Sequence, residues 1–238
     1  MSPPSVMFPG RFNGPPDSAN GGYACGVIAA QVPAGLVEVT LRHPPPLDTP
    51  LVVEQIGERY QVRPAGGEVV AVARPVDEPV DPVPTVSAIP ADASPALGDD
   101  IHPFRTCFTC GPDRAPGDGL RIFAKRTARQ GVLADHWIPD DSFGEQVPPE
   151  VVWAALDCPG GWAAFERIPG GVAVLGRMTA PPHVGVKWMP VSLAEPGECV
   201  MRVRGVAAGG GEHDGPMRRD ERLPMRRLNS SRSRRAGL

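Results

Sequence analysis

Apolar residues recur at helical spacing directly after a loop-like opening segment. Residues 9–22 read PGRFNGPPDSANGG, a composition typical of a loop, and Ser18 and Asn20 near its end are suitable helix caps. Between residues 22 and 32, apolar side chains lie three and four positions apart, and the alanines and glycines allow close packing. The pattern predicts a helix that begins near residue 22 and ends before Pro33.

Three β-rich stretches follow this helix. They cover residues 36–41, 50–63 and 68–76, and the turn-forming segments HPPPLD and AGG separate them. Such runs predict an antiparallel meander. One helix followed by several long strands indicates an α+β fold.

The same kinds of element occur again in the second half of the chain. Residues 77–103 contain six prolines and little periodic apolar content, which is typical of an extended linker. Beyond it, the pattern predicts strands at 120–127 and 131–139, a helix from about 149 to 156 or slightly further, and a strand at 170–180. The shared plan of the two halves predicts a structural duplication.

The composition is that of a globular protein. The chain has 238 residues, of which 41% are hydrophobic, and a formal net charge of -3. It contains no run of 18 apolar residues, and its first ten residues lack the pattern of a secretory signal. We therefore expect a cytoplasmic protein with no membrane partner. Five scattered cysteines favour reduced thiols over a disulfide framework.

The charge reverses in the C-terminal segment. Residues 201–238 carry ten arginines and four acidic residues, a net charge of +6, whereas the rest of the chain carries -9. This segment lacks interleaved aromatic residues, so we expect no nucleic-acid partner. The alternating strand pattern is also lost after about residue 180, except in ECVMRVRGV. We expect residues 186–238 to be an atypical, largely disordered tail, truncated or frameshifted, that leaves the second sheet incomplete.

Three short motifs resemble those of hotdog-fold acyl-CoA thioesterases. They are NGGYA at 20–24, CFTCG at 107–111 with GLRI at 119–122, and WAALD at 153–157. In that family a long central helix is wrapped by an antiparallel sheet, and the active site lies where two hotdog units meet. The resemblance thus implies two fused hotdog repeats. Their expected boundaries are 1–78 for the first repeat, 79–103 for the Pro-rich linker and 104–185 for a truncated second repeat.

The resemblance also identifies candidate catalytic residues. Gly21 and Gly22 lack Cβ atoms, so their N–H groups can approach a thioester carbonyl at a helix start and stabilise its oxyanion. Alternatively, they only permit close packing. Asp157 matches the mid-helix acid of the family, which implies a nucleophile or general base; the alternative is a capping residue at a helix end. Asn20 matches a polar residue common before the glycine pair, or is a simple N-cap.

The first half of the chain has the Asn-Gly-Gly motif but lacks the acidic residue, and the second half has the acidic residue but lacks the motif. Ala29 stands at the acidic position of the first repeat, and residues 148–150 replace Asn-Gly-Gly in the second. We therefore expect one composite site that hydrolyses an acyl-CoA or acyl-carrier thioester without a metal or redox cofactor, in a protein that pairs further as a homodimer. The alternatives are a catalytically silent acyl-CoA or acyl-carrier binding protein and a hotdog dehydratase. Asn20 disfavours the dehydratase, because such enzymes usually have a catalytic histidine near the helix.

The cysteine pair at 107 and 110 allows a second interpretation. Two thiolates separated by two residues can bind one tetrahedral metal, so Cys107 and Cys110, with His102 upstream, are suited to half of a zinc site. Cys158 and Cys199 are the available completing ligands, but nothing in their spacing brings them to the pair. The resemblance favours buried packing roles for these cysteines.

Overall fold

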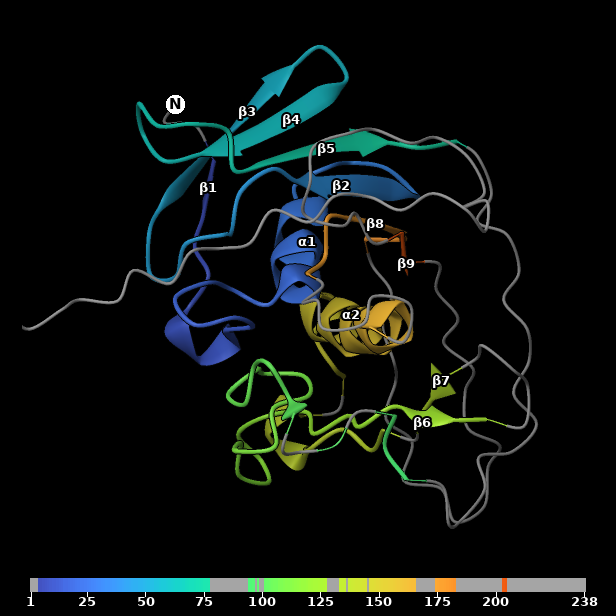
Figure 1. Cartoon of the computed structure of the whole chain (residues 1–238). Helices are drawn as coiled ribbons and strands as arrows, with labels where there is room; N and C mark the ends of the chain where they lie inside the picture. Colours follow the sequence, from blue (N-terminus) through green and yellow to red (C-terminus); the bar gives the residue numbers. More distant parts are fainter. Residues whose placement is uncertain are drawn as a thin grey trace, which may run out of the picture.

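A computed structural model describes residues 4–77, 94–96, 98, 101–127, 133–135, 137–144, 146–165, 174–182 and 203–204 (Figure 1). Its elements are β1 (Ser5–Val6), η1 (Gly10–Phe12), α1 (Gly21–Ala29), β2 (Val37–Leu41), β3 (Leu51–Ile56), β4 (Arg59–Arg63), β5 (Ala71–Pro75), β6 (Lys125–Arg126), β7 (Leu133–Ala134), η3 (Asp141–Phe143), α2 (Pro149–Phe165), β8 (Arg177–Ala180) and β9 (Val203–Arg204). The fold is α+β, with an antiparallel sheet and two α-helices. The predicted fold class is confirmed at this level.

One antiparallel sheet joins strands from both halves of the chain. Its order is β1-β3-β4-β5-β2-β8-β9. Strand β2 pairs with β5 along one edge and with β8 along the other, where Val39 lies opposite Met178. The C-terminal half thus extends the N-terminal sheet.

The predicted meander is confirmed only for β3, β4 and β5, and the stretch at 50–63 forms the first two of these strands. A meander would have paired the stretch at 36–41 with β3, and this part of the prediction is wrong, because β2 lies beside β5. Strand β1, which pairs with β3, was not predicted.

The alternation in β2 explains its two faces. Val37 and Val39 are fully buried on the core side. Glu38 points the other way and pairs with the Arg74 guanidinium at 2.9 Å on β5 and with that of Arg177 at 3.9 Å on β8. Cross-strand pairs of opposite charge support the register on both sides. The apolar face is thereby directed at the helices.

Helix α1 is buried on almost every side, and most of its residues pack against the sheet or α2 (Figure 1). The side chain of Asn20 caps it by accepting a hydrogen bond from the Tyr23 N–H at 2.9 Å. Helix α1 ends at Ala29, slightly earlier than predicted.

Helix α2 continues well past residue 156, through Pro159 to Phe165. A proline inside a helix removes one hydrogen bond and normally ends it. Here Trp162 lies beyond the proline, is 3% exposed, and packs into a small second core with Cys107, Cys110 and Ala124. This packing compensates for the lost hydrogen bond, because helix stability in proteins comes mostly from the buried face.

The two strands predicted at 120–127 and 131–139 are much shorter than expected. Within the described residues they are reduced to β6 and β7, which pair with each other. Leu120, Ile122 and Ala124 are buried alternately, as in a strand. The partner of this segment is a loop, because the N–H groups of Leu120 and Ile122 donate to the carbonyls at 108 and 109. The alternation was correct, but the assignment to a long strand was wrong.

Several predictions fall wholly or partly outside the described residues. They concern most of the linker at 79–103, the start of the 170–180 strand, and nearly all of the tail at 186–238. Within that tail, Val203 and Arg204 form β9 against β8. Among the helices that the structure describes, none is long and apolar enough to cross a membrane.

Candidate functional site

Glycines on α1 let its backbone touch that of α2. A Cβ atom at Gly22 would lie 2.4 Å from the Trp153 carbonyl oxygen, and one at Gly26 would lie 2.6 Å from the Glu150 Cα. Any side chain at these positions would force the helices apart. Because Gly22 faces the middle of α2 and Gly26 faces its start, the two helices run antiparallel. The close contact brings the start of α1 to Asp157.

Asp157 lies inside α2 with its carboxylate directed at the N-terminus of α1. Its Oδ2 accepts a hydrogen bond from the Gly22 N–H at 2.9 Å, and the residue is only 8% exposed. Burial raises the pKa of Asp157 to about 7, against the lowering effect of the Gly22 N–H and with a further increase from Cys107. The interpretation of Asp157 as a helix-end cap is wrong, because α2 continues to Phe165.

The first N–H groups of α1 have different partners. The N–H of Gly22 donates to Asp157 and that of Tyr23 donates to Asn20. In the part of the chain that the structure describes, no acceptor takes the N–H of Gly21. Gly21 is half-buried, and a Cβ there would lie 2.6 Å from the Leu175 Cβ. Of the two N–H groups predicted to face a substrate carbonyl, that of Gly21 is therefore the one not already engaged.

Asn20 links this helix start to the cysteines. Its Oδ1 accepts from Tyr23, so its amide nitrogen points the other way, toward the sulfurs of Cys107 at 3.8 Å and Cys158 at 4.0 Å. The N-cap interpretation of Asn20 is confirmed. The contact with two sulfurs was not foreseen, and Asn20 is only 2% exposed.

The structure brings Cys158 to the pair of Cys107 and Cys110. The three sulfur atoms lie within 4.8 Å of one another, and those of Cys107 and Cys158 are 3.8 Å apart. Hydrogen bonds from Cys110 and Cys158, together with backbone N–H groups, hold the pKa of Cys107 well below its ordinary value despite burial. Cys25, on α1, is buried apart from this trio, and burial raises its pKa. The sequence signal for the trio was CxxCG combined with a third cysteine directly after Asp157.

Comparison with known proteins assigns this chain to no family. No protein-family model matches this chain, and no curated protein and no solved structure matches it. The function must therefore be argued from the geometry.

A shallow hollow of about 330 Å³ lies away from this site. It is lined by residues of the loops 116–121 and 137–143, including Trp137 and Phe143. Neither Asp157 nor the glycine pair lines it. The hollow therefore does not bear on the chemistry at the start of α1.

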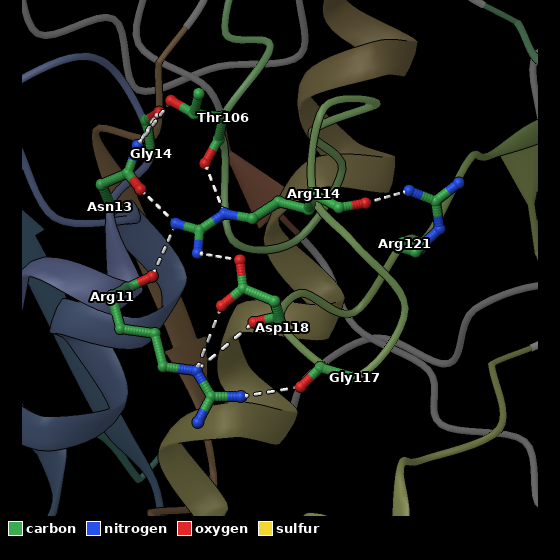
Figure 2. Close-up of polar contacts among 8 residues, drawn as sticks. All are labelled: Arg11, Asn13, Gly14, Thr106, Arg114, Gly117, Asp118 and Arg121. Carbon is green, nitrogen blue, oxygen red and sulfur yellow. Dashed lines mark hydrogen bonds and ion pairs between the residues drawn. The ribbon is translucent and has the colours of Figure 1, made fainter.

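A polar network fixes the CxxCG loop against the N-terminal loop (Figure 2). Arg114 is its centre, with a side chain only 11% exposed. Its three guanidinium nitrogens donate to four acceptors: the carbonyl oxygens of Thr106 at 2.8 Å and Arg11 at 2.7 Å, the Asp118 carboxylate at 2.9 Å, and the Asn13 side chain. Arg11 in turn donates to the carbonyls of Gly117 and Asp118. The network positions the cysteine pair beside α1.

Replacing Arg114 by Lys is expected to lower the free energy of unfolding by about 2 kcal/mol. A single ammonium group cannot reach all the acceptors that the planar guanidinium reaches, so some are left unsatisfied. Urea unfolding of both proteins measures the change. The control is Arg105→Lys, since Arg105 pairs with Asp113 on an exposed surface and its replacement should change stability much less. Equal effects of the two substitutions would contradict the role given to Arg114.

Proposed function

We propose that this protein hydrolyses acyl-CoA or acyl-carrier thioesters at a composite site formed by the N-terminus of α1 and Asp157 of α2. The observation that carries the proposal is the 2.9 Å hydrogen bond between the Gly22 N–H and the Asp157 carboxylate, beside the unengaged N–H of Gly21. A buried carboxylate at the positive end of a helix combines an acid–base group with a site for developing negative charge.

The proposed mechanism uses both sides of this contact, the N-terminus of α1 and the Asp157 carboxylate inside α2. The thioester carbonyl oxygen accepts a hydrogen bond from Gly21, whose N–H lies in the first turn of α1. Asp157 Oδ2 is held by Gly22, while Oδ1 accepts no hydrogen bond from any described residue. In this proposal Oδ1 either takes a proton from an attacking water or attacks the carbonyl directly and forms a mixed anhydride. In both routes the C–S bond breaks and the carrier leaves as a thiol. In the second route, a water then hydrolyses the anhydride, which releases the acid and restores the Asp157 carboxylate.

The fold is compatible with the arrangement from which this site was predicted. Each half contributes one helix, the helices are antiparallel, and β8 continues the sheet beside β2. Ala29 follows Gly22 by the same number of positions as Asp157 follows Glu150. This spacing supports two hotdog units with one functional acid, and it forms part of the proposal.

A catalytically silent acyl-binding protein is the second candidate. It is favoured by Leu175, which lies against Gly21, and by the Gly22 N–H, which is already engaged by Asp157. The dehydratase alternative has no comparable support, because Asn20 acts as the helix cap.

One assay separates hydrolysis from silent binding. The purified full chain is incubated with acyl-CoAs of different chain lengths, free thiol is followed with a chromogenic disulfide, and binding is measured in parallel by calorimetry. Thiol release that increases in proportion to protein concentration supports hydrolysis. Saturable binding without thiol release contradicts hydrolysis and supports the silent protein. The absence of both binding and thiol release contradicts both candidates.

A further inference from the structure

Three cysteine sulfurs converge at the junction of the CxxCG loop and α2. Cys107 and Cys110 come from the loop and Cys158 from the helix, yet all three sulfurs lie within 4.8 Å of one another. The 3.8 Å between the sulfurs of Cys107 and Cys158 is far longer than the roughly 2.05 Å of a disulfide. It equals the separation of about 3.8 Å expected for two thiolates bound to one tetrahedral Zn²⁺ at 2.3 Å. The Cys107–Cys158 spacing therefore fits two thiolates bound to one metal ion.

The loop is shaped around the sulfur of Cys107. Gly111 donates from its N–H to the Cys107 carbonyl at 2.8 Å and closes a tight turn. A Cβ at Gly111 would lie 2.5–2.6 Å from backbone atoms of Arg105 and Cys107, so the turn requires glycine. The turn thus presents both cysteines to one point.

Asn20 adds a side-chain donor to the same sulfurs. Its amide nitrogen faces Cys107 and Cys158, and its orientation is fixed because its oxygen caps α1. A neutral thiol is a weak acceptor, whereas a metal-bound thiolate is a strong one. Donors that point at ligand atoms are also what orients and supports metal ligands in proteins. A buried site in which a fixed amide N–H group faces two sulfurs is suited to thiolates neutralised by a cation.

We propose that Cys107, Cys110 and Cys158 bind one Zn²⁺ ion. The ion binds all three cysteines as thiolates, so every thiol proton that they still carry is released to solvent, with no change of oxidation state. Within the described residues, the cluster of side chains close enough to share an ion consists of these three cysteines. The described residues thus supply three ligands, and a zinc site with three protein ligands takes water or another exogenous ligand as its fourth. The ion ties the CxxCG loop to α2 beside the start of α1.

Metal analysis of the full chain without a polyhistidine tag tests the proposal. The protein is purified under reducing conditions, reconstituted with zinc and freed of excess metal, and its zinc content is measured by mass spectrometry. We expect about one zinc per chain, released on titration of the thiols with a mercurial reagent. Cys158→Ser and Cys107→Ser should lower the affinity for zinc at least tenfold. The control Cys25→Ala changes a buried cysteine outside the trio and should keep the metal.

A spectroscopic experiment on the wild-type chain tests the proposal even if the serine variants do not fold. Anaerobic titration of the wild-type chain with Co²⁺ should give thiolate-to-cobalt charge-transfer absorption and the intense visible bands of tetrahedral coordination, and Zn²⁺ should displace both. A chelator should lower the melting temperature of the zinc-loaded protein. The proposal is overturned by a chain that takes up no zinc or cobalt, by equal zinc affinity in Cys158→Ser, or by a Cys107–Cys158 disulfide in place of the metal. None of these readouts depends on thioester hydrolysis.

Discussion

Replacing Asp157 by Asn is expected to lower kcat/KM for thioester hydrolysis about 10²–10⁴-fold, the usual contribution of a positioned acid–base group. The amide has the same shape as the carboxylate, and its oxygen still accepts the hydrogen bond from Gly22. What is lost is the group that takes the proton or attacks the carbonyl. The free-thiol assay on both proteins, at equal concentration, gives the ratio.

The fold of the Asp157→Asn variant should be unchanged or slightly more stable. The substitution removes a buried ionisable group without creating a cavity, and the hydrogen bond to α1 is retained. Thermal unfolding monitors this. Asp113→Asn is the matched control, because Asp113 is exposed and lies in the CxxCG loop region. Full activity in a folded Asp157→Asn protein would exclude Asp157 as the catalytic acid.

Substituting Gly22 or Gly26 by Ala is expected to destabilise the protein by about 3 kcal/mol, at the upper end of what overpacking normally costs. The added methyl group would meet the Trp153 carbonyl oxygen at 2.4 Å in the first case and the Glu150 Cα at 2.6 Å in the second. These are backbone atoms, so the clash cannot be relieved by a side-chain rotation. Either α1 or α2 must move, and the contact between Gly22 and Asp157 is lost with it. Urea unfolding measures the loss.

Gly161→Ala is the control for this pair, because it makes the same change inside the other helix. Within the described part of the chain, no atom lies within 4 Å of a Cβ built at Gly161, which is part of α2. Alanine is a better helix former than glycine, so this variant should be more stable by about 0.5–1 kcal/mol. A destabilisation of equal size at all three positions would show that close helix packing is not what selects glycine at 22 and 26.

Local pattern was sufficient where the partner of a segment lies nearby in the chain. The β-rich stretches at 50–63 and 68–76 predicted the antiparallel run of β3, β4 and β5, because neighbouring strands of a meander need only short turns. The stretch at 36–41 predicted β2 but not its pairing with β5, because two strands intervene in the chain. The polar residue before the glycine pair predicted the cap on α1 for the same reason. The pattern failed at 120–127, where burial alternates but the hydrogen-bond partner is a loop. Periodicity records which side of a segment is buried, not what covers it.

The sequence alone therefore determined the α+β class, the first helix and the N-terminal strands, and it singled out Asn20, Gly21, Gly22 and Asp157 as candidates. Only the tertiary structure decided that Asp157 lies inside a long helix and that its carboxylate meets the N–H of Gly22, 135 positions earlier in the chain. It also placed Cys158 against the CxxCG loop. Both outcomes depend on the antiparallel contact of α1 and α2. That contact is set by the absence of side chains on one helix face, and spacing along the chain does not specify which surface such a face will meet.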